Sequence, residues 1–127
     1  GDILFCLRGS LGKSALVEGY KKGAIASSLV IIRLYTSVNQ YYFHNYLDSS
    51  LSSIMISRYD NGTAQPNLAA TDLRKFLVPL PSTVEQKRIV TKVDELMTLC
   101  DQLKIRLSGT QNIQAHLADA IVEQVTT

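Results

Sequence analysis

The sequence changes character at Val78-Pro79-Leu80-Pro81. Before this segment, short apolar runs alternate with glycine-containing turns, a pattern typical of short strands and small helices. After it, apolar residues recur every three or four positions, the pattern of an amphipathic helix. The prolines cannot donate hydrogen bonds to a strand ladder, so the segment lies at a sheet edge or leaves the sheet. We therefore expect a compact head over 1–81 and a helical spacer over 82–127.

The apolar pattern of the head is typical of strands in its first part and of helices in its second part. Apolar, partly β-branched runs at 3–7, 14–17 and 27–34 are separated by glycine turns and predict strands. Helical stripes follow over 37–47 and 48–58. The pattern predicts an α+β fold: a small, mostly antiparallel sheet with short helices, followed by a long coiled-coil-like helix.

Three finer expectations concern the second half of the head. In the helix over 48–58, Leu51, Ile54 and Met55 are expected to face inward. Asn67 is expected to cap a short helical turn over 71–73. Five tyrosines lie near arginines, and their helical spacing is more typical of a core flank than of base stacking; they are Tyr35, Tyr41, Tyr42, Tyr46 and Tyr59.

The spacer begins with a helix-start signal and continues with a heptad pattern. Ser82 and Glu85 fit a capping box, in which each side chain bonds the other residue's backbone N–H. Six apolar residues then follow at alternating spacings of four and three, the seam of a coiled coil. The seam consists of Ile89, Val93, Leu96, Cys100, Leu103 and Leu107. Such a regular pattern predicts a contact with another helix, that is, a subunit interface.

Gly109 leaves two alternatives open. The helix could end there, and a second helix with Ile113, Leu117 and Ile121 could fold back. Alternatively the helix continues, because a glycine inside a helix costs only about 1 kcal/mol and no proline forces a stop. We expect one helix of about 40 residues, roughly 60 Å long.

Composition excludes several classes of protein. With 46% apolar and 19% charged residues, the chain is globular and not disordered. No apolar run approaches the roughly 20 residues of a membrane span, and the first residues lack the basic start of a signal peptide. Cys6 and Cys100 are expected to be reduced thiols in a cytoplasmic protein. Since the chain opens directly on an apolar strand, we expect it to be a fragment of a longer protein.

No catalytic pattern is evident. Gly12-Lys13-Ser14 resembles the end of a phosphate-binding loop, but Leu7 stands where that motif requires glycine. His44 and His116 lack metal-ligand spacing, and the acidic residues form no pair suited to acid–base catalysis. We therefore expect a protein that is not an enzyme and that needs neither metal nor cofactor.

Two polar loops are the candidates for binding. Residues 1–81 carry a net charge of +3 and residues 82–127 a net charge of −1, so the head has the sign that suits a polyanion. The loop over 8–13 is either a phosphate- or base-contacting loop or a solvated turn. In the stretch 61–68, Gln65 and Asn67 could bond adenine or could lock the loop through backbone hydrogen bonds.

Several segments together, in this order and spacing, resemble the DNA specificity subunit of type I restriction–modification systems. These segments are 1–5 (Gly-Asp-Ile-Leu-Phe), 8–13 (Arg-Gly-Ser-Leu-Gly-Lys), 62–68 (Gly-Thr-Ala-Gln-Pro-Asn-Leu), 72–76 (Asp-Leu-Arg-Lys-Phe), 79–81 (Pro-Leu-Pro) and 85–90 (Glu-Gln-Lys-Arg-Ile-Val). The resemblance implies two target recognition domains, each reading half of a split DNA site. Long helices that pack antiparallel separate these domains and dock modification subunits, which bind S-adenosylmethionine and methylate adenine, while restriction subunits join outside.

The resemblance makes this chain the later part of one recognition domain (1–81) with its spacer helix (82–127). The chain is shorter than the family's subunit, so its seam is expected to pair with another copy. The expected partners are double-stranded DNA and the modification and restriction subunits. The expected DNA-contacting residues are Arg8, Ser10, Lys13, Lys21, Lys22, Arg58, Gln65 and Asn67. The alternative is a protein–protein module whose helix drives oligomerisation without binding DNA.

Overall fold

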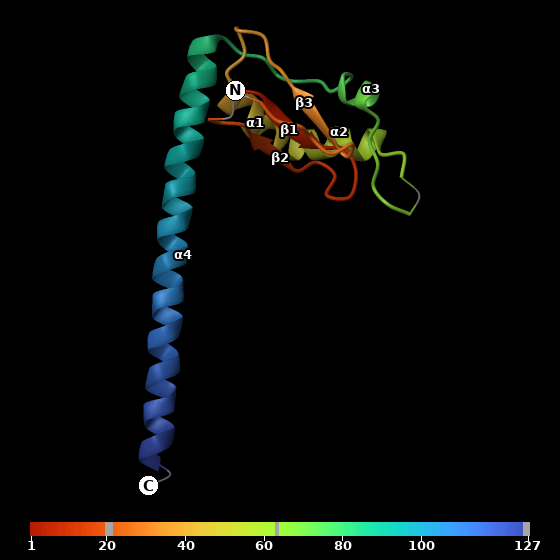
Figure 1. The fold of residues 1–127 in the computed structure, drawn as a ribbon. Helices are drawn as coiled ribbons and strands as arrows, with labels where there is room; N and C mark the ends of the chain where they lie inside the picture. The colour runs from red at the N-terminus through yellow and green to blue at the C-terminus, as the bar shows by residue number, and fades with distance from the viewer. Residues whose placement is uncertain (20–21, 63, 126–127) are drawn as a thin grey trace. The chain divides into compact units, whose positions relative to one another are not determined.

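A computed structural model of the chain describes residues 1–19, 22–62 and 64–125. By its contacts the chain divides into two units, Gly1–Val90 and Thr91–Thr127. The first unit contains a small sheet, short helices and the beginning of the last helix (Figure 1). The second unit contains the continuation of that helix.

The sheet has its first strand in the centre, flanked by two antiparallel neighbours. The strands are β1 (Ile3–Cys6), β2 (Ser14–Leu16) and β3 (Leu29–Ile32). In the central strand, Ile3 pairs with Leu16 on one side and Ile32 on the other. The prediction of an α+β fold with a small antiparallel sheet is confirmed. β1 and β2 are each one residue shorter than their apolar runs, whereas β3 covers only the middle four residues of the run 27–34.

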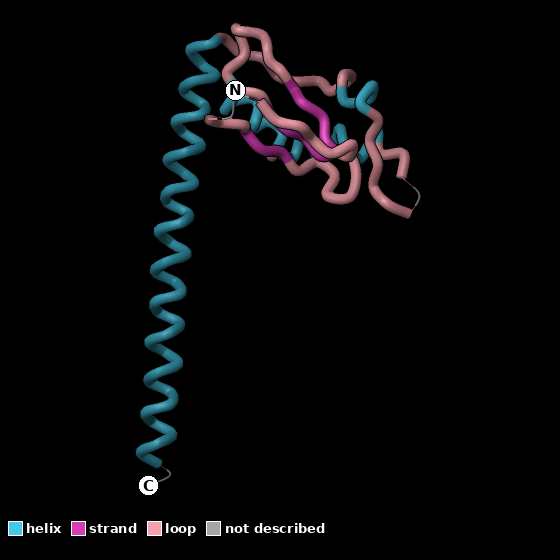
Figure 2. Tube along the Cα trace, viewed as in Figure 1, coloured by secondary structure: helices cyan, strands magenta, loops and turns pink. Residues whose placement is uncertain are grey.

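Alternation along β1 determines which face of the sheet is buried. Ile3 and Phe5 have no exposed surface and form the core with Tyr46, Leu47 and Leu68. Two of these core residues come from α1 (Gln40–Leu47), which with α2 (Ser50–Tyr59) lies behind the strands in Figure 2. Burying side chains of this size contributes roughly 2 kcal/mol each, so one face of a three-stranded sheet accounts for much of the head's stability.

Helix α1 begins at a side-chain cap and buries its tyrosine stripe. The Oδ1 atom of Asn39 accepts from the backbone N–H groups of Tyr41 (2.9 Å) and Tyr42 (3.0 Å). Tyr42 and Tyr46 are buried, whereas Tyr35 is 87% exposed. The prediction that tyrosines flank the core is therefore confirmed for the two that lie one helical turn apart.

The prediction for the inward face of α2 is partly wrong. Met55 is buried, but Leu51 and Ile54 are 52% and 62% exposed. The buried positions are instead Ser52 and Met55, with Ile56 packed against the core. Close packing of α2 favours the small side chain of Ser52 on its inner face, and apolar periodicity does not reveal that preference.

The short turn predicted over 71–73 is helix α3 (Ala70–Leu73), but its predicted cap is wrong. The capping position is Ala69, which has extended backbone angles and makes no side-chain capping bond. Asn67 lies two residues earlier, and its Oδ1 atom accepts a hydrogen bond from Nε of Arg8. The side chain of Asn67, which the local pattern predicted to cap the helix, therefore bonds to Arg8, 59 positions away in the sequence.

The junction between head and helix is an extended segment held by its backbone carbonyl groups. The hydroxyl of Tyr46 donates to the carbonyl oxygen of Leu77 (3.0 Å), and that of Tyr42 donates to Pro79 (2.6 Å). The side-chain amide of Gln86 donates to the carbonyl oxygen of Pro81 (2.9 Å). Every second carbonyl therefore accepts a hydrogen bond from a side chain. The prolines have no N–H group, so no backbone donor of theirs is left unpaired outside the sheet.

The spacing of the two tyrosine hydroxyl groups fits the spacing of the carbonyl groups in this segment, because one turn of a helix is nearly as long as two residues of extended chain. Tyr42 and Tyr46 are four residues apart on a helix, about 6 Å along its axis. Every second residue of an extended chain repeats at about 6.5 Å and points to the same side. One helical turn of α1 can therefore serve alternate carbonyls of a strand-like segment that runs in the opposite direction.

Gln86 joins the first turns of α4 (Thr83–Val125) to the head. Its side chain is buried, with 1% of the residue exposed. Oε1 accepts from the backbone N–H of Asn39 (2.8 Å), and Nε2 donates to the carbonyl oxygens of Pro81 (2.9 Å) and Ser37 (3.3 Å). Since an amide nitrogen has two hydrogens, both are used, and the cost of burying this polar group is offset.

The helix α4 is continuous through Gly109, which confirms the single-helix alternative. Its 43 residues correspond to about 65 Å at the standard rise. At its start, Oγ of Ser82 accepts from the backbone N–H of Glu85 (3.3 Å), as the capping box predicts. The carboxylate of Glu85 lies 3.5 Å from Arg88, a neighbour on the exposed surface, so its predicted bond back to Ser82 is replaced by an ion pair.

We predict that Tyr42→Phe and Tyr46→Phe each lower the free energy of unfolding by about 1 kcal/mol, the usual net value of one hydrogen bond. Burial raises the pKa of both tyrosines above the ordinary value of 10.0. Their contribution is therefore complete below pH 10.0 and is lost as the pH rises through the folded-state pKa values. Urea unfolding at neutral and alkaline pH measures both effects.

Tyr35→Phe is the matched control, because that ring is exposed. A variant with both Tyr42 and Tyr46 replaced by Phe should lose less stability at alkaline pH than the parent protein. Equal alkaline losses in the two proteins would contradict the carbonyl-bonding role of the tyrosines.

Candidate functional site

The loop after β1 is a tight turn that exposes polar and basic side chains. Gly9 and Gly12 adopt φ angles of +77° and +87°, a region that other residues rarely enter. The backbone N–H of Cys6 bonds to the carbonyl of Lys13 (2.9 Å), so the loop closes on itself. Arg8, Ser10 and Lys13 are all exposed along it.

The second loop, over 60–68, is closed by one carboxylate. Oδ1 of Asp60 accepts from the backbone N–H groups of Gly62 (2.9 Å) and Asn67 (2.8 Å). The bond from Asn67, and to a smaller extent the bond from Gly62, holds the pKa of the Asp60 carboxyl below its ordinary range. A Cβ atom on Gly62 would lie 1.8 Å from the carbonyl oxygen of Gln65, so only glycine fits there. The Asp60 carboxylate therefore ties the start of this loop, at Gly62, to its end, at Asn67.

The two loops are joined to each other. Arg8 and Asn67 form an antiparallel β-bridge, and Nε of Arg8 donates to Oδ1 of Asn67 (3.0 Å). The next residue, Leu68, is buried and donates its N–H to the carbonyl of Leu7 (3.0 Å). Both loops thus form a single polar surface, which we call the two-loop surface: residues 8–13, 60–62 and 64–68.

Helix α2 supports this surface from below. A methyl group on Gly12 would lie 2.8 Å from Cδ1 of Ile56, so α2 and the first loop are in close contact. Arg58, in the last turn of α2, lies two residues before Asp60, and its guanidinium carbon is 5.8 Å from the centre of the Tyr59 ring. The cation is exposed. Its ring contact favours one orientation while leaving the charge accessible.

The structure therefore groups most of the predicted DNA-contacting residues and separates the others. Six of the eight belong to the two-loop surface or to the helix turn beside it: Arg8, Ser10, Lys13, Arg58, Gln65 and Asn67. Lys22 lines a groove of about 900 Å³ with Leu4, Ile31 and Arg33. Leu4 and Ile31, which pair across the middle of the sheet, place this groove over one sheet face, and Arg33 extends it toward the Gly1 end. The two-loop surface instead follows the Cys6 end of β1. Lys21 lies outside the described residues.

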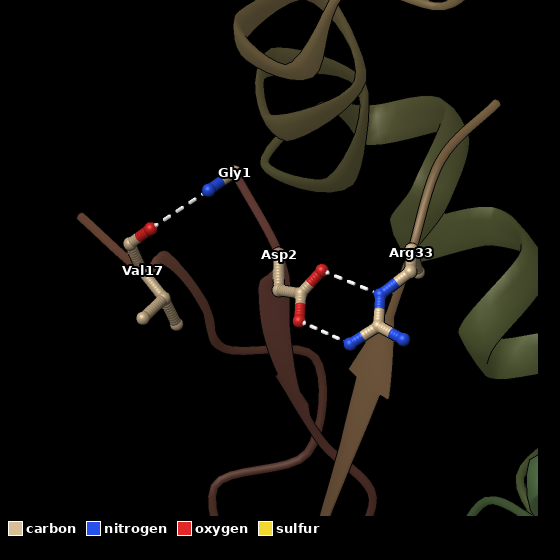
Figure 3. A network of polar contacts seen from close by, with 4 residues as sticks. All are labelled: Gly1, Asp2, Val17 and Arg33. Carbon is tan, nitrogen blue, oxygen red and sulfur yellow. Dashed lines mark hydrogen bonds and ion pairs between the residues drawn. The ribbon is translucent and has the colours of Figure 1, made fainter. Parts of the chain in front are cut away.

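The Gly1 end of the sheet carries an internal ion pair. Two nitrogens of Arg33, Nε and Nη2, donate to the two carboxylate oxygens of Asp2 at 3.0 and 2.7 Å (Figure 3). The backbone nitrogen of Gly1 donates to the carbonyl of Val17 (3.0 Å). The hydrogen bond from Arg33 lowers the pKa of Asp2, and the same bond raises the pKa of Arg33. Asp2 therefore balances this cation, which offers less net charge to a polyanion than Arg8 or Lys13.

The predicted interface seam lies along α4. Ile89 and Val93 are half-buried, whereas Leu96, Leu103 and Leu107 are 51%, 55% and 60% exposed. Cys100, the sixth seam residue, is also exposed and is a free thiol, as is Cys6. Ion pairs between neighbours such as Lys92–Glu95 and Lys104–Asp101 lie at positions outside the seam.

The sequence patterns did not predict the roles of Asp60, Gln86 and the hydroxyl groups of the buried tyrosines. The signal for Asp60 was present, since an Asp immediately before Asn-Gly is suited to accept backbone N–H groups in a turn. Gln86 carries no such signal, because its three partners lie in two other segments of the chain.

Within residues 1–19, 22–62 and 64–125, no three His, Cys, Asp or Glu side chains are grouped so that they could hold a metal ion. None of the helices in the described part of the chain combines the length and apolar character that a membrane span requires.

The fold and its exposed surfaces define an α+β head with a two-loop polar surface, and a helix that presents an apolar seam. Residues 1–108 match the family described as "Type I restriction modification DNA specificity domain", and the chain belongs to this family. That family is the one that the order of its sequence motifs predicted.

Three relatives from Escherichia coli agree with this assignment. The chain is 30% identical over 130 residues to the type I restriction enzyme EcoEI specificity subunit, an alignment that covers 97% of the chain and 22% of the relative. It is 34% identical over 86 residues to the EcoAI specificity subunit (68% and 13%) and 28% identical over 109 residues to the EcoBI specificity subunit (85% and 23%). The chain thus spans less than a quarter of the length of these relatives.

We predict that the amide proton resonances of Gly62 and Asn67 titrate together, with a midpoint below the ordinary Asp value of 3.8. Both protons bond to Asp60, whose lowered pKa means that the loop is held closed above 3.8 and is released as the pH falls through the folded-state pKa. NMR spectra recorded across an acid titration give the midpoint. In Asp60→Asn this shared transition should disappear, and a midpoint at or above 3.8 in the parent would count against the closure.

Proposed function

We propose that this chain provides a DNA-recognition surface of a type I restriction–modification specificity subunit. The proposal depends mainly on the two-loop surface, in which the Arg8–Asn67 bridge joins two exposed loops. Membership of the DNA specificity domain family supports the same function. The surface would act by binding in the cytoplasm, and partner subunits would carry out adenine methylation and cleavage.

The side chains of this surface suggest a division of roles. Arg8, Lys13 and Arg58 are exposed cations that would contact phosphates and position the duplex. Ser10 and Gln65 are exposed polar side chains suited to base edges or sugars. Asn67 already accepts from Arg8, so its main role would be to brace the loops. Lys21 and Lys22, if they contact DNA, would do so through a separate region.

The helix would supply the protein contacts. We propose that the exposed part of its seam binds a second helix, in this chain another copy, and that the same helix docks modification and restriction subunits. The specificity subunits that the chain resembles are several times longer than the chain. Binding of a two-part DNA site would require two such heads joined through their helices.

We predict that binding to a mixed-sequence duplex weakens steeply with salt. Three phosphate contacts correspond to a slope of about −3 in a plot of log affinity against log salt concentration. Lys13→Glu should reduce this slope by about 1, and the double variant Arg8→Glu/Lys13→Glu should abolish measurable binding. Fluorescence anisotropy with a labelled duplex over a salt series gives the slope.

The matched control is Lys92→Glu/Lys104→Glu, which makes the same change of charge on exposed positions of α4. This variant should bind like the parent. Equal losses of duplex affinity in the two double variants would mean that net charge alone governs binding. Failure of the parent to bind the duplex at low salt would contradict the proposal.

We predict that the parent chain self-associates and that Leu96→Asp makes it monomeric, because a charge in a coiled-coil seam is buried without a partner. Ile105→Asp is the control, since Ile105 lies outside the seam and is 73% exposed. Sedimentation equilibrium distinguishes the two variants. A parent that remains monomeric at all concentrations would contradict the proposed pairing.

A further inference from the structure

Gln86 has a burial and a set of bonds that set it apart from the other glutamines described on α4. It has 1% of its surface exposed, whereas Gln102, Gln111 and Gln114 are exposed. A buried amide is costly unless its donors and acceptors are paired. In Gln86 the oxygen and both hydrogens are paired with backbone groups. Those partners belong to the head, and none belongs to α4 itself.

The partners of Gln86 connect three segments. Oε1 bonds to the backbone N–H of Asn39, whose own side chain caps α1. Nε2 bonds to Ser37, just before that cap, and to Pro81, at the end of the extended junction. One side chain thus fixes the first turn of α4 to the start of α1 and to the junction. Apolar contacts would allow sliding at this point, but three directional bonds allow little.

We propose that Gln86 is a positioning residue: its buried amide fixes the direction in which α4 begins relative to the two-loop surface, and it thereby sets the separation at which two such surfaces can engage duplex DNA. The first part of this statement concerns residues 1–90 alone. The second part rests on the proposed function, because it requires two DNA-recognising heads joined through their helices.

The first test uses the whole chain and does not involve DNA. Spin labels at Leu51 on α2 and Arg88 on α4, with Cys6 and Cys100 changed to Ser, report the distance between head and helix start by pulsed electron resonance. Gln86→Met keeps the length of the side chain and its helix propensity but removes the amide. We expect one narrow distance distribution in the parent and a broadened or shifted distribution in Gln86→Met.

Gln102→Met, at an exposed position of the same helix, is the matched control and should keep the narrow distribution. Hydrogen exchange at the Asn39 amide should become about tenfold faster in Gln86→Met, since its acceptor is lost. Gln86→Glu keeps an acceptor for Asn39 and loses the two donated bonds, so it should broaden the distribution while retaining slow exchange there. An unchanged distribution in Gln86→Met, or loss of the folded head in both Gln86 variants, would overturn the proposal.

The second test addresses DNA. Duplexes carrying two copies of a sequence selected by the parent chain from a random library are compared at a series of separations. We expect the parent to prefer one separation by about tenfold or more, a preference that Gln86→Met loses while its affinity for a single copy changes less than about twofold. Retention of the parent's preference would overturn the second part. If no chain binds DNA, the proposed function fails, and the label distances still decide the positioning role.

Discussion

Hydrogen bonds to alternate carbonyl groups of one extended segment are the interaction on which the architecture depends. The carbonyls of Leu77, Pro79 and Pro81 accept from Tyr46, Tyr42 and Gln86 in turn. The two tyrosines belong to the helix that covers the sheet, and the glutamine belongs to the helix that follows the segment. A proline-containing segment that cannot join a sheet is thereby held by side-chain hydrogen bonds, and the start of α4 is held with it.

Local patterns predicted the elements, and long-range polar contacts escaped prediction. The apolar runs, the Ser82 cap and the heptad seam depend on neighbours within a few residues, so periodicity and capping rules identify them. The bond between Tyr42 and Pro79 joins residues 37 positions apart, and no composition rule indicates it. The inner face of α2 was misjudged for a related reason, since tight packing there selects Ser52 over larger apolar neighbours.

In the candidate site, too, local patterns were predicted from the sequence and long-range contacts were not. The polar character of the two loops is enough to single out Arg8, Lys13, Gln65 and Asn67, because glycine turns expose side chains. The fold adds that the two loops holding these residues are joined by a β-bridge and closed by Asp60. It also separates Lys22, which lies in a groove beside the Arg33–Asp2 ion pair. The sequence shows that Lys22 lies in a basic turn, but it does not show beside which part of the sheet that turn lies.

We propose that the two-loop surface is the part of this chain that binds DNA. The most direct measurement is a map of backbone amide shifts as a mixed-sequence duplex is added to the labelled chain. We expect the largest changes on residues 8–13, 60–62 and 64–68 and little change at the Gly1 end of the sheet, with Asp2 and Arg33. Changes concentrated at the Gly1 end, or along α4 alone, would contradict it.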